Sequence, residues 1–230
     1  MKTYIIRLND NETSQHLAKS AIESVEKHNL DYTIFNGFPP KEGLQYLNNL
    51  NIRFNASIAR SEWTPGTFGC FASHYKLWTM CSQSTENMLI IEHDGVLLKD
   101  PTNLEFDEAC HLDRYIPFSS QHGMDDTTYS TTMYTTNTNG PYKAGVYPYP
   151  KNKFYGSDEI TGSCFRALYG YILSPKGATK LLKFVDKFGA FPADKTVCER
   201  AVNIQRANCT YVRLNPELSS INKQNRLSTR

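Results

Sequence analysis

The chain of 230 residues is long enough to bury one large α/β core, so we expect a single domain spanning residues 1–230. Its apolar content of 40% and charged content of 21% exclude disordered and fibrous proteins. The formal net charge of +2 provides no overall basic field that would hold a nucleic-acid backbone or an anionic membrane.

The start of the chain does not have the pattern of a signal peptide or a membrane span. The apolar stretch within Met1–Arg7 is too short for either and leads directly into polar residues, and no later apolar run approaches the length of a signal peptide or a membrane span. The six cysteines lie far apart without a C-x-x-C pair, which argues against a zinc knuckle or a redox motif. We therefore expect reduced thiols, a cytoplasmic location and no membrane span.

The first part of the chain alternates strand and helix patterns. Apolar strands are predicted at Tyr4–Leu8 and Tyr32–Phe35. Between them, apolar residues recur at the spacing of one helix face, at Leu17, Ala18, Ala21, Ile22 and Val25.

The same order then repeats, with a helix followed by a strand. The helix carries Phe71, Tyr75 and Trp78 on one face, and the strand is the continuous apolar run Met88–Ile91. A strand that is apolar at every position is typical of a mostly parallel sheet with helices on both faces. The sequence therefore predicts an α/β fold, in which a mostly parallel mixed sheet is flanked by helices.

Residues 121–160 interrupt this pattern, because they are rich in Thr, Tyr, Asn, Gly and Pro. A polar segment of this length inside a compact domain indicates a functional loop, although a surface insertion without function has the same composition. A strand is predicted after it at Tyr169–Leu173. Ser174 and Pro175 then have the pattern of a helix cap and first turn.

The chemistry of the chain is concentrated where the buried strand ends, at Glu92, His93, Asp94 and Gly95. In open α/β sheets, ligands bind beyond the carboxyl ends of the strands. Two carboxylates one residue apart supply the oxygen ligands that a hard divalent cation prefers, and a glycine lets the backbone pass close to a ligand. The alternative is that these acids only close a strand in a turn.

Several motifs, in chain order, resemble glycosyltransferase family 25, the lipopolysaccharide and collagen galactosyltransferase type. They cover most of the chain, from the first strand to about Lys195. The helix segment is similar to the family's Gly-Cys-x-x-Ser-His motif, and the segment around Glu92 is similar to its acidic triplet. The matching segments are Ile5–Asp10, Gly69–Trp78, Leu89–Val96, Gly170–Ala178 and Pro192–Asp194.

The resemblance implies a GT-A-like fold, a nucleotide-sugar donor such as a UDP-hexose, and a divalent metal, Mn²⁺ or Mg²⁺. It also implies transfer to a hydroxyl of a glycan, lipopolysaccharide or other acceptor, with inversion of configuration. The departure is His93, which stands where the family usually has an aspartate. This change removes one negative charge but keeps both outer acids of the motif.

The resemblance and the chemistry of the transfer together suggest roles for the acids. Asp94 is expected to bind the metal, and Glu92 to hold the ribose or to reach the metal through water. Asp194 is the leading candidate for the base that accepts the acceptor's proton, ahead of Asp158 and Glu159. The competing interpretation is that Asp194 caps a helix beginning at Lys195.

Further residues complete the predicted site. Those expected to bind the donor are Leu8, Asn9 and Arg60 together with Glu92, His93 and Asp94. His122 is a candidate for the metal shell, because imidazole suits ions of the manganese type, although an ordinary loop histidine is the simpler interpretation. His74 lies among apolar residues, which favours a packed and hydrogen-bonded histidine over a catalytic one.

Two alternatives to this function stay open from the sequence. One is a noncatalytic module that binds a carbohydrate or nucleotide sugar, with His93 marking the loss of the metal site. The other is a viral enzyme that glycosylates a modified base in DNA. Its phosphate contacts would come from Lys151, Lys153, Arg200, Arg206, Arg213, Arg226 and Arg230.

Overall fold

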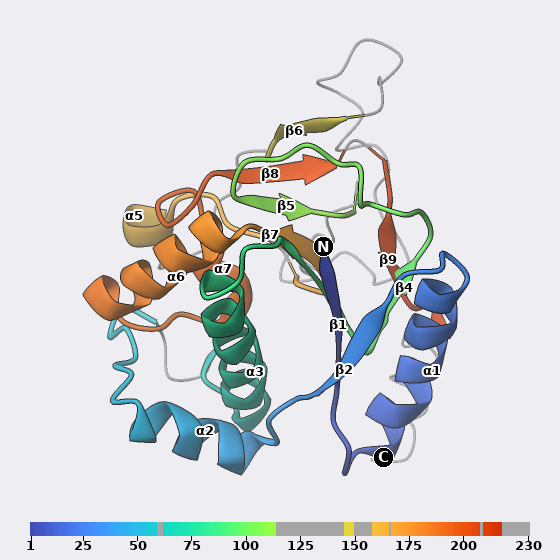
Figure 1. The fold of residues 1–230 in the computed structure, drawn as a ribbon. Coiled ribbons are helices and arrows are strands. Elements are labelled where there is room, and N and C mark those ends of the chain that lie inside the picture. Colours follow the sequence, from blue (N-terminus) through green and yellow to red (C-terminus); the bar gives the residue numbers. More distant parts are fainter. Residues whose placement is uncertain (59–61, 114–144, 150–157, 166, 208, 218–230) are drawn as a thin grey trace, which may run out of the picture.

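The computed structural model describes residues 1–58, 62–113, 145–149, 158–165, 167–207 and 209–217, and these form two sheets flanked by helices (Figure 1). The large sheet has seven strands in the order β2-β1-β3-β7-β5-β8-β6, and the small sheet pairs β4 with β9. The strands are β1 (Lys2–Arg7), β2 (Tyr32–Asn36), β3 (Met88–Glu92), β4 (Gly95–Leu97), β5 (Ala109–His111), β6 (Val146–Pro148), β7 (Gly170–Leu173), β8 (Ile204–Ala207) and β9 (Val212–Leu214).

The large sheet is mixed but mostly parallel, which confirms the predicted fold class. Strands β2, β1 and β3 are parallel to one another. Strand β7 is antiparallel to its two neighbours, β3 and β5. Beyond it, β8 is parallel to β5, and the last strand, β6, is antiparallel to β8. The strands β1, β2, β3, β5 and β8 therefore share one direction. Ile6 pairs with Glu92, so the carboxyl ends of β1 and β3 lie together at one edge.

The helices cover both faces of this sheet, with α1 on one face and α3 and α6 on the other (Figure 1). Alternate strand residues divide between two cores, because successive side chains of a strand point to opposite faces. Ile5 packs with α1, for example, whereas its neighbour Ile6 packs with α3. The longer helices are α1 (Glu12–Glu26), α2 (Pro40–Asn49), α3 (Pro65–Ser82) and α6 (Pro175–Phe188), with short α5 (Asp158–Thr161) and α7 (Ala193–Thr196).

Local sequence signals set the starts of the long helices. Asn11, Thr64 and Ser174 each accept a hydrogen bond from a backbone N–H in the first turn of the helix that follows. Such caps satisfy amide groups that have no partner within the helix. Pro175 occupies the first turn after Ser174, so the predicted start of α6 is confirmed. No helix of the described residues is long and apolar enough to cross a membrane.

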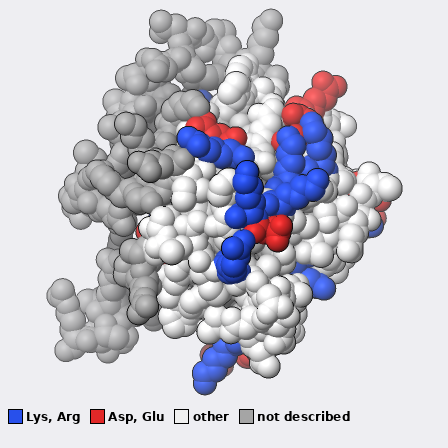
Figure 2. All heavy atoms as spheres, turned by 90° about the vertical axis from the view of Figure 1, so that its left-hand side faces the viewer, with Lys and Arg blue, Asp and Glu red and all other residues white. Residues whose placement is uncertain are grey.

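A buried carboxylate attaches α6 to the end of β5. Glu108, whose side chain is 1% exposed, forms ion pairs with Lys176 at 2.9 Å and Lys180 at 2.6 Å, and it accepts a hydrogen bond from the Asn203 amide at 2.8 Å. Figure 2 shows basic side chains gathered on the face that α6 covers, interspersed with acidic ones. This surface is therefore of mixed charge, and part of it serves to hold the helix.

Several elements were not predicted from the sequence. They are α2, α5, the three-residue strands β4, β5, β6 and β9, and the short strand β8. Strand β6 lies within the polar segment 121–160, so residues 146–148 of that segment extend the sheet rather than form a loop. Residues 121–144 and 150–157 of the segment lie outside the described residues.

Candidate active site

The candidate site begins where β3 leaves the large sheet. Glu92 is the last residue of β3, His93 and Asp94 form a turn, and Gly95 starts β4. The backbone N–H of Glu92 donates to the carbonyl of Tyr169 at 3.1 Å. A Cβ atom at Gly95 would overlap that same carbonyl oxygen. Gly95 is thus required for the close approach of the turn to the Tyr169 carbonyl, a constraint within the protein that the sequence did not indicate.

Glu92 is held in place by the buried His74. The Nε2 atom of His74 lies 2.9 Å from Oε1 of Glu92, and the thiol of Cys70 donates to the same oxygen at 3.7 Å. Burial alone would raise the pKa of Glu92, but the hydrogen bond with His74, helped by His93 and by the Cys70 thiol, outweighs it and holds this pKa below its ordinary value. Glu92 is therefore an oriented carboxylate in its charged form.

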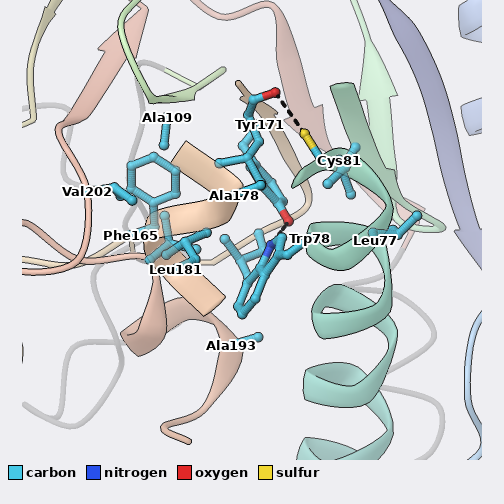
Figure 3. Packing of buried hydrophobic residues seen from close by; sticks show 14 of the residues in the cluster. Leu77, Trp78, Cys81, Ala109, Phe165, Tyr171, Ala178, Leu181, Ala193 and Val202 are labelled. Atoms are coloured by element: carbon cyan, nitrogen blue, oxygen red, sulfur yellow. Dashed lines mark hydrogen bonds between the residues drawn. The ribbon is translucent and has the colours of Figure 1, made fainter. Parts of the chain in front are cut away.

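The tautomer of His74 follows from its other neighbours. The indole N–H of Trp78 donates to the hydroxyl oxygen of Tyr171 at 2.9 Å, as Figure 3 shows. The Tyr171 hydroxyl proton is then free to point at Nδ1 of His74, 2.9 Å away. Because Nδ1 accepts, Nε2 carries the proton and donates to Glu92. The expectation of a packed, hydrogen-bonded histidine is confirmed, and its contact with Glu92 adds a link to the site.

Each residue of the Gly-Cys-x-x-Ser-His motif has a structural reason to be there. A Cβ at Gly69 would lie 2.5 Å from the carbonyl oxygen of Phe38, so only glycine fits against this segment. Ser73 accepts from the Phe38 amide at 2.9 Å and donates to the Gly69 carbonyl at 2.8 Å. Cys70 and His74 lie one turn apart and both reach Glu92. The motif therefore packs α3 near the site and orients one carboxylate.

Asp94 has an unusual environment for an acid. Its Oδ1 atom is buried and has no hydrogen-bond partner among the described residues. Burial and the negative charge of Glu92 raise the pKa of Asp94 to about 7. The backbone carbonyl of Asp94 accepts a hydrogen bond from the amide of Asn215 at 2.6 Å. An unsatisfied buried carboxylate oxygen calls for a cation or a donor that the protein itself does not supply.

Asp194 is close enough to join this group of acids. Burial raises the pKa of Asp194 to about 6. The charge of Glu92 acts in the same direction, whereas the backbone amide and the charge of Lys195 act against it. Burial and the charges of Glu92, Asp194 and Asp94 together raise the pKa of Cys70 well above its ordinary value. The fold thus brings the three predicted acids together around the Cys70 thiol.

The interpretation that Asp194 caps a helix beginning at Lys195 is wrong about where the helix begins. Helix α7 begins at Ala193 with Pro192 at the cap position, so Asp194 lies inside the first turn. Its Oδ1 does accept a hydrogen bond from the Lys195 amide at 2.9 Å. The Lys195 ammonium in turn pairs with Glu62. One carboxylate oxygen of Asp194 is thereby fixed by the helix, which sets the direction of the other.

The remaining predicted residues divide into two groups. Leu8 and Asn9 follow β1 at the same sheet edge as Glu92, and the Asn9 amide donates to the Asn36 side chain at 3.2 Å. His93 is in the turn, where burial lowers its pKa against the opposing charge of Glu92. Arg60 and His122 lie outside the described residues, as do the side chains of Asp158 and Glu159 in α5.

One group of metal-ligating side chains among the described residues lies close enough to share an ion. It consists of Cys70, His74 and Glu92, whose ligand atoms lie within 4.8 Å of one another. However, Nε2 of His74 carries a proton and has no lone pair for a metal in this arrangement. This triplet is therefore better described as the support of Glu92 than as a metal centre.

Comparison with known families decides the general identity. A family model described as glycosyltransferase family 25 (LPS biosynthesis protein) matches residues 1–197. The chain belongs to glycosyltransferase family 25. Membership assigns it to glycosyl transfer in general and confirms the resemblance seen in the sequence motifs.

Solved structures add little to this assignment. The CTP:phosphocholine cytidylyltransferase LicC from Streptococcus pneumoniae is similar at 13% identity, 98% coverage of both chains and a TM-score of 0.43. The galactosyltransferase LgtC, solved with donor and acceptor sugar analogues, is similar at 10% identity over 85% of this chain and 69% of its own, with a TM-score of 0.38. Similarities of this size carry no information about the site. No curated protein matches the chain.

Within this glycosyltransferase, sequence reasoning missed two residues that line the site. Tyr169 supplies the carbonyl to which Glu92 donates, and Asn215 contacts Asp94. Tyr169 is the first residue of the strand predicted at Tyr169–Leu173, but no sequence pattern indicated that its carbonyl accepts a hydrogen bond from Glu92. Asn215 follows a three-residue strand beyond the region that the family model matches, so no local pattern indicated it.

Proposed function

We propose that this family 25 protein transfers a hexose from a UDP-hexose to a hydroxyl of a glycan or lipid-linked glycan, with the help of a divalent metal and with inversion. The observation that carries this proposal is the buried, unpartnered Oδ1 of Asp94 beside Glu92 and Asp194. Glu92 and Asp94 lie at the carboxyl end of β3, where α/β enzymes bind their ligands, and the charge of Glu92 acts on Asp194 in α7.

The donor set suits a hard divalent cation such as Mn²⁺ or Mg²⁺. Asp94 would hold it through the unpartnered Oδ1, and Glu92 would add an oxygen directly or through water, because only its Oε1 is engaged by His74. When bound, such an ion neutralises charge that develops on the departing diphosphate. Replacement of the family's middle aspartate by His93 leaves both of these acids in place.

The chain's own residues then have distinct tasks. His74, fixed by Tyr171 and Trp78, holds Glu92 charged and oriented toward the donor. Asp194 is suited to accept the proton of the acceptor hydroxyl, since its pKa of about 6 lies near neutrality. Inversion needs only one such base, because the acceptor attacks the anomeric carbon directly.

A donor screen tests this function. The purified protein is incubated with a panel of UDP-hexoses and other nucleotide sugars, with Mn²⁺, with Mg²⁺ and with a chelator, and release of the nucleotide is measured. We expect metal-dependent hydrolysis of at least one UDP-hexose. Binding of a donor without hydrolysis or transfer under any condition would instead support the noncatalytic module.

A further inference from the structure

Asn215 follows β9 and has a buried side chain with one half of its amide unused. The residue is 3% exposed. Its Oδ1 accepts a hydrogen bond from the Glu217 amide at 3.0 Å, which fixes the orientation of the side-chain amide. The Nδ2 group therefore faces away from that turn, and it has no hydrogen-bond partner among the described residues. The unused group is thus a donor, and not an acceptor.

This donor lies opposite Asp94. Gly95 pairs with Leu214 in the antiparallel β4–β9 ladder, and the next pair outward is Asp94 with Asn215, joined by the backbone bond of 2.6 Å. Side chains of residues directly opposite in an antiparallel ladder project from the same face, with Cβ atoms about 4.5–5.5 Å apart. The side chains of Asn215 and Asp94 should therefore project from the same face of the ladder, and their unused donor and acceptor do not hydrogen-bond to each other.

Two unsatisfied buried groups on one short ladder are costly to the free protein. Native proteins leave few such groups, and those at a site are satisfied when a ligand binds. A metal ion at Asp94 would satisfy the carboxylate but offer nothing to an N–H donor. The oxygens of a bound diphosphate or sugar are acceptors, and they would lie next to an ion held by Asp94.

We propose that Asn215 is a donor-binding residue of this glycosyltransferase, whose Nδ2 donates a hydrogen bond to a diphosphate or sugar oxygen of the nucleotide sugar. This inference rests on the proposed function, because it requires the nucleotide sugar to bind beside Asp94. It gives β4 and β9 a role in the site: their pairing brings a residue from beyond the family-matched region against the acidic motif.

Two substitutions separate this role from a structural one. Asn215→Asp keeps an oxygen that accepts from the Glu217 amide but removes the Nδ2 donor, whereas Asn215→Ala removes both groups. Binding of UMP, UDP and UDP-galactose in Mn²⁺ is measured by calorimetry, together with thermal stability. Asn48→Ala, an exposed position on α2, is the matched control and is expected to bind as the unsubstituted protein does.

We expect both Asn215 variants to bind UDP-galactose about 10- to 100-fold more weakly, as expected for the loss of a hydrogen bond to a charged or strongly polar oxygen. An equal loss for UDP places the contact on the diphosphate, and a loss confined to UDP-galactose places it on the sugar. UMP affinity should not change.

Other results overturn the inference. Equal weakening of UMP would place the contact on the nucleoside, and unchanged binding of all three ligands would assign the donor to an ordered water. A structural role would appear as parallel losses of stability and binding in Asn215→Ala, with both restored in Asn215→Asp. If the unsubstituted protein binds none of the three ligands, the proposed function fails first, and this inference falls with it.

Discussion

Glu92 at the end of β3 is joined to His74 in the middle of α3 by a hydrogen bond of 2.9 Å. The carboxylate is partly accessible, with 23% of its side chain exposed, whereas the histidine is completely buried. The charged side chain of Glu92, at the carboxyl end of β3, is thus held in position by a residue of the buried core. Tyr171 and Trp78 complete the chain of contacts, so the orientation of Glu92 depends on residues that no ligand touches.

Replacement of His74 should therefore move the pH dependence of the enzyme. In His74→Leu, the interaction that lowers the pKa of Glu92 is lost and burial then raises it. Under the proposed function, donor hydrolysis needs the charged carboxylate, so activity in this variant should be lost at a higher pH as the solution is made acidic. His74→Gln keeps an amide donor near the Nε2 position and should restore part of the original profile. Identical acid limbs in pH–rate profiles of all three proteins would contradict this role.

Asp94→Asn should abolish metal-dependent activity while the fold is retained. The amide keeps the shape of the side chain but loses the charge that holds a divalent ion. Titration with Mn²⁺, followed by the heat of binding, should show affinity reduced by at least about tenfold, and circular dichroism should be unchanged. The exposed Asp100→Asn serves as control. Normal metal affinity and turnover in Asp94→Asn would remove this residue from the metal site.

Gly95→Ala should destabilise the protein by about 1–3 kcal/mol, since the added methyl group overlaps the Tyr169 carbonyl and also crowds Ile91. Gly66→Ala is the matched control. It lies in the first turn of α3, where a Cβ has only Thr64 within 4 Å, at 3.9 Å, and alanine favours the helix. Urea unfolding at pH 7 measures both, and equal stability of the two variants would show that the Tyr169 contact is readily relieved.

Glu108 should make the free energy of unfolding depend on pH in the acid range. Burial opposes its ionisation, but hydrogen bonds from Lys180, the Asn203 amide and Lys176 prevail and lower its pKa from 4.5. A lowered pKa in the folded state gives stability that is present above pH about 4.5 and is lost as pH falls through the folded value.

The test compares urea unfolding at pH 6 and pH 3.5. Glu108→Gln should be less stable than the original protein at pH 6 by roughly 1–3 kcal/mol, the range for hydrogen bonds to charged groups. The difference should shrink at pH 3.5, because this pH lies below 4.5 and protonation of the carboxylate in the unfolded chain then reduces the stability that its lowered folded-state pKa provides. Glu105→Gln, at an exposed position, should show neither effect. A difference that is the same at both pH values would mean that the ion pairs of Glu108 contribute nothing.

The sequence predicted those parts of the fold that depend on neighbouring residues. Ser174 and Pro175 predict the start of α6, because a helix cap and the fixed φ angle of proline both act within the first turn of the helix. The sequence also placed Glu92 and Asp94 at the end of a buried strand, because a fully apolar run identifies such a strand.

The unpredicted parts depend on contacts between distant segments. Strands β4 and β9 have three residues each, too few for a period of alternation, so their pairing and the contact of Asn215 with Asp94 have no local signal. His74 was correctly predicted to be packed, but its bond to Glu92 depends on how α3 crosses β3. The position of a helix along a sheet is set by side-chain packing between them, and this packing cannot be read from a single sequence.

The last prediction concerns Asp194 as the base. Asp194→Asn should lower turnover by roughly two to four orders of magnitude while donor affinity hardly changes, because a general base acts only on the acceptor proton. The substitution leaves the helix intact, since the asparagine Oδ1 still accepts from the Lys195 amide as Asp194 does. Thermal stability should therefore stay close to that of the original protein. The control is Asp186→Asn, at an exposed position on α6.

The pH profile adds a second measurement. The pKa of Asp194 is raised to about 6, so turnover should decline as the pH falls below that value, where the base becomes protonated. In Asp194→Asn the part of this decline that comes from Asp194 should be lost, whereas any decline from protonation of Asp94, whose pKa is raised to about 7, should remain. A purely structural Asp194 would predict normal turnover and an unchanged profile in the asparagine variant. That outcome would move the base to Asp158 or Glu159, and the same measurements on their amide variants would decide between them.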